Sequence, residues 1–141
     1  MMISRGIRNC NPLNIRRTKT VWQGQRSEQQ DGSFVQFEGM KWGWRAAFVL
    51  LTRNYFNQHK LTTVRSIIYR WAPPQDHNAT ETYVKRVCQL MDYDPDAYLG
   101  IPTMVPSRWM QLAWAMGIVE NGSADQLDPL AMLEGWRLSR E

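Results

Sequence analysis

From residue 40 onward, apolar residues recur three or four positions apart, which is the period of amphipathic helices. The first predicted helix has about 18 residues, and its apolar positions are Trp44, Ala47, Phe48, Leu51 and Tyr55. Thr62 or Thr63 can cap a second helix, which Pro73 and Pro74 end. Asn78 or Thr80 can cap a third. The apolar positions of the second and third helices are Val64, Ile67, Ile68, Trp71, Val84, Val87, Cys88 and Met91.

A proline-rich stretch, residues 94–106, leads to a fourth helix opened by Ser107, and residues 128–139 form a short final helix. Residues 5–38 differ, because they are polar and carry the turn signals Asn11-Pro12 and Asp31-Gly32. The alternation in residues 33–37 predicts a small β-hairpin or loop lobe there. The pattern as a whole predicts a mainly α (α+β) fold of four to five helices with a small β-hairpin lobe, in one domain spanning residues 1–141.

Composition and charge narrow the functional classes. A chain of 141 residues fits one domain, and its net charge of +4 favours polyanionic partners such as nucleic acid, an anionic membrane surface or a cell wall. Cys10 and Cys88 have no metal-site spacing; a long-range disulfide between them stays open, but we expect two free thiols in a protein folded in a reducing cytosol. His59 and His77 lie far apart in sequence, so we expect no metal site and no cofactor. The sequence begins without a secretory signal and predicts no membrane insertion.

The fourth helix carries a carboxylate in an unusual position. Trp109, Ala113, Met116 and Glu120 form one stripe on the apolar, inward face. Glu120 also lies in the last turn, because Asn121-Gly122 is a helix stop. Partial burial and the negative end of the helix dipole both favour its protonated form. A protonated glutamic acid is what general-acid cleavage of a glycoside requires, although a plain ion pair with an arginine at the helix end would explain the position equally well.

Several segments together resemble a family of phage and prophage proteins described as virion structural or lysozyme-like muralytic proteins. They are RGIRNCNPLNIRR, Trp22-Gln23-Gly24, Phe34 to Phe37, Gly43-Trp44-Arg45-Ala46, RWAPPQDHNATETYV and Glu120-Asn121-Gly122. The pattern is also similar to lysozyme-like glucosaminidases and lytic transglycosylases, in which the helix ending in a catalytic Glu comes first. Here that helix comes last, which suggests a circularly permuted lysozyme-like domain.

The resemblance implies Glu120 as the catalytic acid/base. A hydrolase would need a second carboxylate about 5 Å or about 6.5–9.5 Å away, and Asp31 and Glu28 in the polar lobe are the candidates. For Asp31 the alternative is a turn former beside Gly32. If neither serves, a single acid/base suits a lytic transglycosylase, in which the 6-hydroxyl of the sugar closes an anhydro ring. The expected substrate-binding residues are Asn11, Asn14, Ile15, Trp22, Phe37, Tyr83 and Asn121; the alternative for the two asparagines of the lobe is an Asx turn.

These observations predict cleavage of the β-1,4 bond between N-acetylmuramic acid and N-acetylglucosamine in peptidoglycan glycan strands. We expect a monomer made in the bacterial cytoplasm that acts in the periplasm or cell wall, or is carried in a virion with other virion proteins as partners. Two alternatives stay open. One is an inactive virion structural or wall-binding protein. The other is a basic nucleic-acid-binding protein, although the main hypothesis expects no nucleic acid partner.

Overall fold

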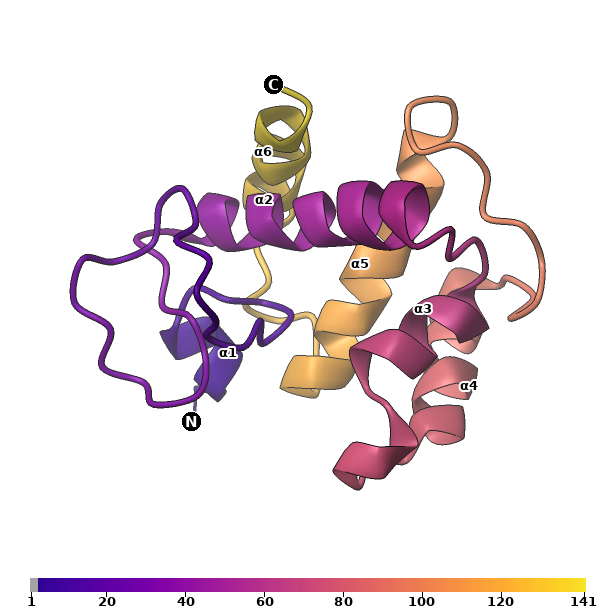
Figure 1. The fold of residues 1–141 in the computed structure, drawn as a ribbon, viewed down its shortest axis with the longest axis horizontal. Helices are drawn as coiled ribbons and strands as arrows, with labels where there is room; N and C mark the ends of the chain where they lie inside the picture. The colour runs from indigo at the N-terminus through magenta and orange to yellow at the C-terminus, as the bar shows by residue number, and fades with distance from the viewer. Residues whose placement is uncertain (1–2) are drawn as a thin grey trace.

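The computed structural model describes residues 3–141 and is mainly helical, as predicted. Figure 1 shows the helices crossing and packing beside one another, with the irregular N-terminal segment at one side. The elements in chain order are α1 (Arg5–Arg8), α2 (Met40–Val49), the π-helix η1 (Leu50–Gln58), α3 (Val64–Trp71), the 3-10 helix η2 (Pro74–Asp76), α4 (Thr80–Met91), α5 (Pro106–Asn121) and α6 (Pro129–Ser139). No helix in this part of the chain combines the length and apolar character needed to cross a membrane.

The helix predicted from residue 40 is one continuous rod made of α2 and η1. The change from α- to π-geometry at Leu50 has no counterpart in the hydrophobic period, because both helix types can keep the same face inward. π-Helical geometry is rare and mostly forms single-turn bulges inside α-helices, which are frequent at functional sites. Here the π-helical half contributes residues to a cavity described below.

The helix ends follow local hydrogen bonding. Thr63, and not Thr62, caps α3, because its hydroxyl accepts from the Ser66 N–H while the Ser66 hydroxyl accepts from the Thr63 N–H. Neither proposed cap of α4 acts as one. Thr80 instead donates to the Ala72 carbonyl at 2.6 Å, which ties the start of α4 to the end of α3. Helix α5 begins one residue before Ser107, at Pro106.

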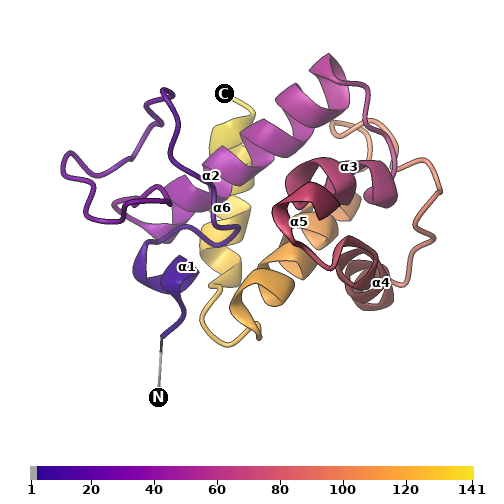
Figure 2. The same ribbon diagram turned by 60° about the horizontal axis from the view of Figure 1, so that its bottom comes forward.

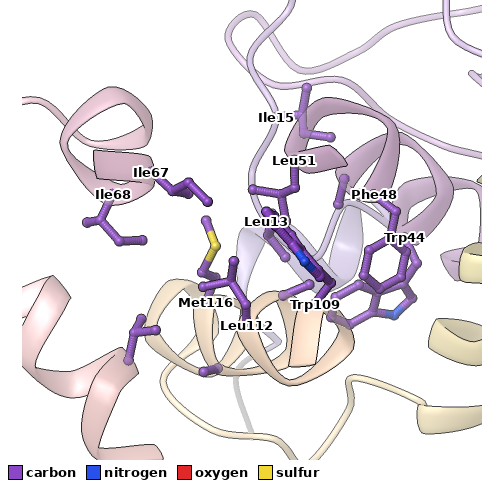
Figure 3. Close-up of a cluster of buried hydrophobic side chains, with 14 of the residues drawn as sticks. Leu13, Ile15, Trp44, Phe48, Leu51, Ile67, Ile68, Trp109, Leu112 and Met116 are labelled. Atoms are coloured by element: carbon purple, nitrogen blue, oxygen red, sulfur yellow. The ribbon is translucent and has the colours of Figure 1, made fainter. Parts of the chain in front are cut away.

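The core lies between the α2–η1 rod, α3 and α5. Trp44, Phe48 and Leu51 face Trp109, Leu112 and Met116 there, with Ile67 and Ile68 closing one side (Figure 3). All of these side chains are fully buried, and each contributes roughly 1.5–3 kcal/mol relative to an exposed position. The inward stripe predicted for α5 is therefore confirmed, which is the property that sets the position of Glu120 at the edge of the core.

Helix α6 crosses α2 at close range. A Cβ on Gly135 would lie 2.5 Å from the Trp44 Cβ and 2.8 Å from the Arg45 backbone nitrogen, so only glycine fits this crossing. The Trp44 Nε1–H donates to the Leu127 carbonyl at 3.0 Å, which fixes the segment before α6. Figure 2 shows α6 lying beside α2, on the side away from α3 and α4.

The predicted β-hairpin does not form in the described chain. Two isolated antiparallel bridges, Arg16 with Phe34 and Gln25 with Phe37, take its place. Side chains form hydrogen bonds with the backbone N–H and C=O groups that a ladder between β-strands would require. Asn11 Nδ2 donates to the carbonyls of Ile15 and Val35, and the Gln29 amide bonds both the N–H and the C=O of Gln36. We call residues 9–38 the N-terminal lobe.

Candidate functional site

Glu120 lies in the last turn of α5 and is partly exposed, next to the core. Gly122 ends the helix with φ +84°, a left-handed conformation that suits glycine. The carboxylate accepts two hydrogen bonds from different parts of the chain. Oε1 accepts from Asn14 Nδ2 at 2.9 Å, and Oε2 accepts from the Tyr83 hydroxyl at 2.9 Å. The structure thus brings together three of the predicted site residues, from the N-terminal lobe, α4 and α5.

Tyr83 approaches the carboxylate from α4. Its pKa is raised well above the ordinary value, first because the side chain is buried and then because the nearby negative charge of Glu120 disfavours a phenolate. The phenol therefore keeps its proton and acts as a permanent donor to Glu120. Since its ring is packed against the core, Tyr83 is well placed to hold the carboxylate in position.

Asn14 reaches Glu120 from a left-handed backbone conformation, with φ +54°. Its neighbours Leu13 and Ile15 are buried and anchor this strained position. The Asn14 Oδ1 atom is itself buried and has no hydrogen-bond partner among the described residues. An unused acceptor of this kind is uncommon in a protein interior, and here it lies on the amide group that bonds Glu120.

The two other predicted asparagines stabilise this arrangement. Asn11 is fully buried; its side chain accepts from the Ile15 N–H at 2.8 Å and donates to the Ile15 carbonyl at 2.9 Å. Asn121 donates to the Pro12 and Gly117 carbonyls at 2.8 and 2.9 Å. The prediction that Asn11 binds substrate is wrong for a side chain without exposure, and Asn121 joins the lobe to α5.

The two hydrogen-bond partners of Glu120 line two different cavities. The first cavity, of about 490 Å³, is lined by Asn14, Ile15, Arg16, Thr18, Thr20, Trp22, Val49, Leu50, Asn54, Tyr55 and Trp71. The second cavity, of about 440 Å³, is lined by Asn78, Ala79, Thr82, Tyr83, Arg86, Ile118, Val119 and Gly122. Glu120 hydrogen-bonds one lining residue of each, Asn14 and Tyr83. Glu120 is not itself a lining residue of either cavity and is linked to each through one hydrogen-bond partner.

Neither predicted second carboxylate, Asp31 or Glu28, lines either of these cavities. Asp31 forms a bidentate ion pair with Arg5, both bonds 2.6 Å long, and also accepts from Asn9 and from the N–H groups of Ser33 and Phe34. The Arg5 guanidinium, the two N–H groups and Asn9 hold the pKa of Asp31 well below its usual range. Asp31 is thus the turn former that the alternative described.

Glu28 is exposed and lines a separate hollow with Arg26, Ser27, Gln30, Gln36 and Glu38. Phe37 is fully buried, so its predicted contact with substrate is wrong as well. Trp22 and Ile15 line the first cavity. The two cysteines are free thiols. No group of three or more His, Cys, Asp or Glu side chains within residues 3–141 could hold a metal ion.

Several lining residues escaped the sequence analysis. Thr18 and Thr20 lie in the polar lobe without a motif, whereas Asn54 had a detectable signal. It follows the buried Leu51 by three residues and so lies beside the inward face of the rod. The apolar period assigns Tyr55 and Trp71 to the core, although Trp71 is also a candidate for stacking on sugar rings; the two meet edge to face, with ring centroids 6.0 Å apart, at the wall of the cavity.

Fold and site together define a mainly helical protein with a partly buried carboxylate, Glu120, held by Asn14 and Tyr83. No family model matches the sequence. One curated relative is Protein P5 of Pseudoalteromonas phage PM2, which is 37% identical over 87 residues. The matched region covers 60% of this chain and 53% of the phage protein, so the chain spans about half the length of that relative. The chain is thus related to a bacteriophage protein.

Proposed function

We propose that this protein cleaves the β-1,4 glycosidic bond between N-acetylmuramic acid and N-acetylglucosamine in peptidoglycan, with Glu120 as the acid/base. The observation that carries the proposal is a partly buried carboxylate held by Asn14 and Tyr83, each of which lines one of the two cavities. A glycan strand occupying both cavities would place one of its glycosidic oxygens near this group. The ion pair with an arginine that would have explained Glu120 otherwise is absent from residues 3–141.

The proposed first step is proton transfer from Glu120 to the leaving glycosidic oxygen. As the proton leaves, negative charge develops on the carboxylate, and the donors of Asn14 and Tyr83 stabilise that charge. In the preceding protonated state the acid needs an acceptor as well. Rotation of the Asn14 side-chain amide by about 180° would present its Oδ1 atom to the protonated acid, and this atom has no hydrogen-bond partner among residues 3–141.

A single carboxylate favours the transglycosylase outcome. The 6-hydroxyl of the muramic acid attacks C1 as the C1–O4 bond breaks, and the new C1–O6 bond closes a 1,6-anhydro ring. Glu120 then takes the proton of the 6-hydroxyl, which restores the protonated acid, and no water is consumed. Because Asp31 is saturated with hydrogen bonds and Glu28 lies at another hollow, neither is assigned to this step.

The first cavity has the composition expected of a sugar-binding surface. Trp22, Tyr55 and Trp71 provide flat apolar faces that suit the C–H faces of pyranose rings. Asn54, Thr18 and Thr20 provide amide and hydroxyl groups for sugar hydroxyls and acetamido groups. The net charge of +4 complements a cell wall that carries carboxylates.

The test is digestion of purified peptidoglycan, followed by turbidity and by mass spectrometry of the products. Wild-type protein is expected to release 1,6-anhydromuramic products, and Glu120→Gln is expected to lose activity by roughly 100-fold or more. Glu28→Gln is the matched control, because it makes the same chemical change at an exposed carboxylate away from the site. Equal activity of wild type and Glu120→Gln would refute the assignment. Products with reducing ends would show hydrolysis instead of transglycosylation.

A further inference from the structure

The first cavity has a positive charge on its wall that no acid of the described chain pairs. Arg16 is the single charged side chain among the described residues that line this cavity. Two other arginines of this region bind Asp31: Arg5 forms the ion pair, and Arg17 donates to the Asp31 carbonyl at 2.9 Å. Arg16 itself is exposed and takes part in no ion pair between residues 3 and 141. Its guanidinium is therefore open to an anionic ligand.

The Arg16 side chain is supported by an aromatic ring. Its Cζ lies 5.1 Å from the centroid of the Phe34 ring, and the backbones of Arg16 and Phe34 are joined by an antiparallel bridge. A guanidinium that stacks on a ring through its flat face keeps the N–H groups along its edge free to donate. Two N–H groups on that edge match the two oxygens of a carboxylate. Arg16 is thus prepared to bind a carboxylate.

The rest of the cavity wall indicates what kind of molecule would carry that carboxylate. Three aromatic rings and an amide, which suit a sugar ring and its acetamido group, come from Trp22, Tyr55, Trp71 and Asn54. Arg70 adds positive potential behind this wall, because its Cζ lies 5.5 Å from the centroid of the Tyr55 ring. No Asp or Glu is among the described lining residues. Glu120 meets the wall only through Asn14, and it is uncharged in the protonated form that the proposed reaction requires.

We propose that Arg16 determines the specificity of the first cavity, by binding a carboxylate on the sugar that occupies it. This inference rests on the proposed function for the kind of glycan, and it selects one sugar within that glycan. An N-acetylmuramyl unit carries a carboxyl group on its lactyl ether or on the peptide joined to it, whereas N-acetylglucosamine carries none. The first cavity is therefore assigned to the muramyl unit. One unpaired arginine at the wall does not form the track of cations that a nucleic acid strand needs.

Binding can be measured without turnover, because the disaccharide N-acetylglucosaminyl-β-1,4-N-acetylmuramic acid lacks the bond that the proposed reaction breaks. Calorimetric titration of the full chain compares two pairs of ligands. One pair is this disaccharide and its methyl ester, which removes the charge and keeps both sugar rings. The other pair is the same disaccharide with an alanyl-glutamate dipeptide on the lactyl group, and the methyl ester of that dipeptide form.

We expect wild-type protein to bind the acid roughly 3- to 10-fold more tightly than the ester in at least one pair. A preference in the first pair would assign the lactyl carboxylate to Arg16, and a preference in the second pair alone would assign a carboxylate of the peptide. Arg16→Gln is expected to lose the preference and to bind the ester as wild type does, which also shows that the variant is folded. Arg16→Lys keeps the charge without the planar fork and is expected to retain part of the preference.

Lys19→Gln is the matched control. Lys19 is an exposed cation between two lining residues, Thr18 and Thr20, but does not itself line the cavity. Its replacement removes the same charge as Arg16→Gln and is expected to leave the preference for the acid unchanged.

Equal affinities for acid and ester in both pairs would overturn the proposal, as would a preference that Arg16→Gln keeps. A preference that Lys19→Gln and Arg16→Gln reduce equally would also overturn it, because it would show diffuse attraction to a negative ligand. A DNA oligonucleotide that displaces the disaccharide, with an affinity that depends on Arg16, would assign the cavity to nucleic acid instead. An Arg16-dependent preference in a protein that does not cleave peptidoglycan would support Arg16 and refute Glu120, so the two proposals fail separately.

Discussion

Gly6 lies where α1 meets the end of α5, and replacing it tests whether the site depends on that contact. A Cβ at this position would lie 2.5 Å from Asn121 Oδ1, 2.9 Å from the Asn11 carbonyl and 3.1 Å from Asn14 Oδ1. All three atoms belong to the network that positions Glu120. One of them is backbone, and Asn121 is held by two further hydrogen bonds to carbonyls. The neighbours therefore have little freedom to move away.

Two effects of Gly6→Ala oppose each other. Alanine in a short helix stabilises by about 0.4–1 kcal/mol through the unfolded chain, whereas forcing a methyl group into a packed contact costs about 1–3 kcal/mol. We expect the contact to dominate, with a net loss of about 1–2 kcal/mol in the free energy of unfolding. For a chain of this size that corresponds to a decrease in Tm of roughly 3–8 °C.

The assay is urea and thermal unfolding of wild type, Gly6→Ala and Gly32→Ala. Gly32 is the matched control, because a Cβ there has no atom within 4 Å. Its replacement is expected to be neutral or slightly stabilising. If Gly6→Ala is as stable as wild type while Gly32→Ala behaves as expected, the contact between α1 and α5 is not tight, and the reasoning about this network is wrong.

Three further predictions follow from the same geometry. Tyr83→Phe removes one hydrogen bond to Glu120 and is expected to lower kcat on peptidoglycan roughly 10- to 100-fold with little change in KM. In a Glu120→Gln background the same substitution is expected to lower kcat hardly any further. Additive losses of kcat in that double-mutant cycle would contradict the positioning role of Tyr83. Trp22→Ala is expected to raise KM more than it lowers kcat, measured on soluble glycan fragments, and an unchanged KM would remove Trp22 from the sugar-binding surface. The Arg5 ion pair holds the pKa of Asp31 low, so the stabilisation that the ionised carboxylate gives is fully present above about pH 4 and is lost as the pH falls further. The Asp31→Asn variant is therefore expected to unfold more easily than wild type at neutral pH but to lose less stability in acid. Parallel profiles of unfolding free energy against pH for the two proteins would refute this role of Asp31.

The helical part of the fold could be predicted because its signals are local. The apolar period in α2, α3, α4 and α5 is confirmed by the buried faces of these helices, and Gly122 and the capping Thr63 mark boundaries. The π-helical geometry of η1 could not be predicted, because no residue pattern in Leu50–Gln58 distinguishes it from an α-helix. The N-terminal lobe was harder still. Its shape depends on long-range side-chain bonds such as Asn11 to Val35.

For the candidate site, too, the local signals were predictable from the sequence and the long-range contacts were not. Glu120 was found because a carboxylate interrupted an apolar stripe, which is a signal within one helix. Its partners Asn14 and Tyr83 are 106 and 37 residues away in the sequence, and only the resemblance suggested them. The roles of Asn11 and Phe37 were predicted wrongly, because residue type and loop position do not reveal that a side chain is fully buried.

Asp31 links the structure of the N-terminal lobe to the position of Glu120. Its carboxylate binds Arg5 of α1 and the backbone of residues 33 and 34, so it fixes α1 against the far end of the lobe. The same helix packs Gly6 against the Asn14 and Asn121 amides. An acid that could have been a second catalytic group is thus placed to stabilise the support of the first. Loss of Asp31 would disturb Glu120 through α1 and Asn14, without any contact between the two carboxylates.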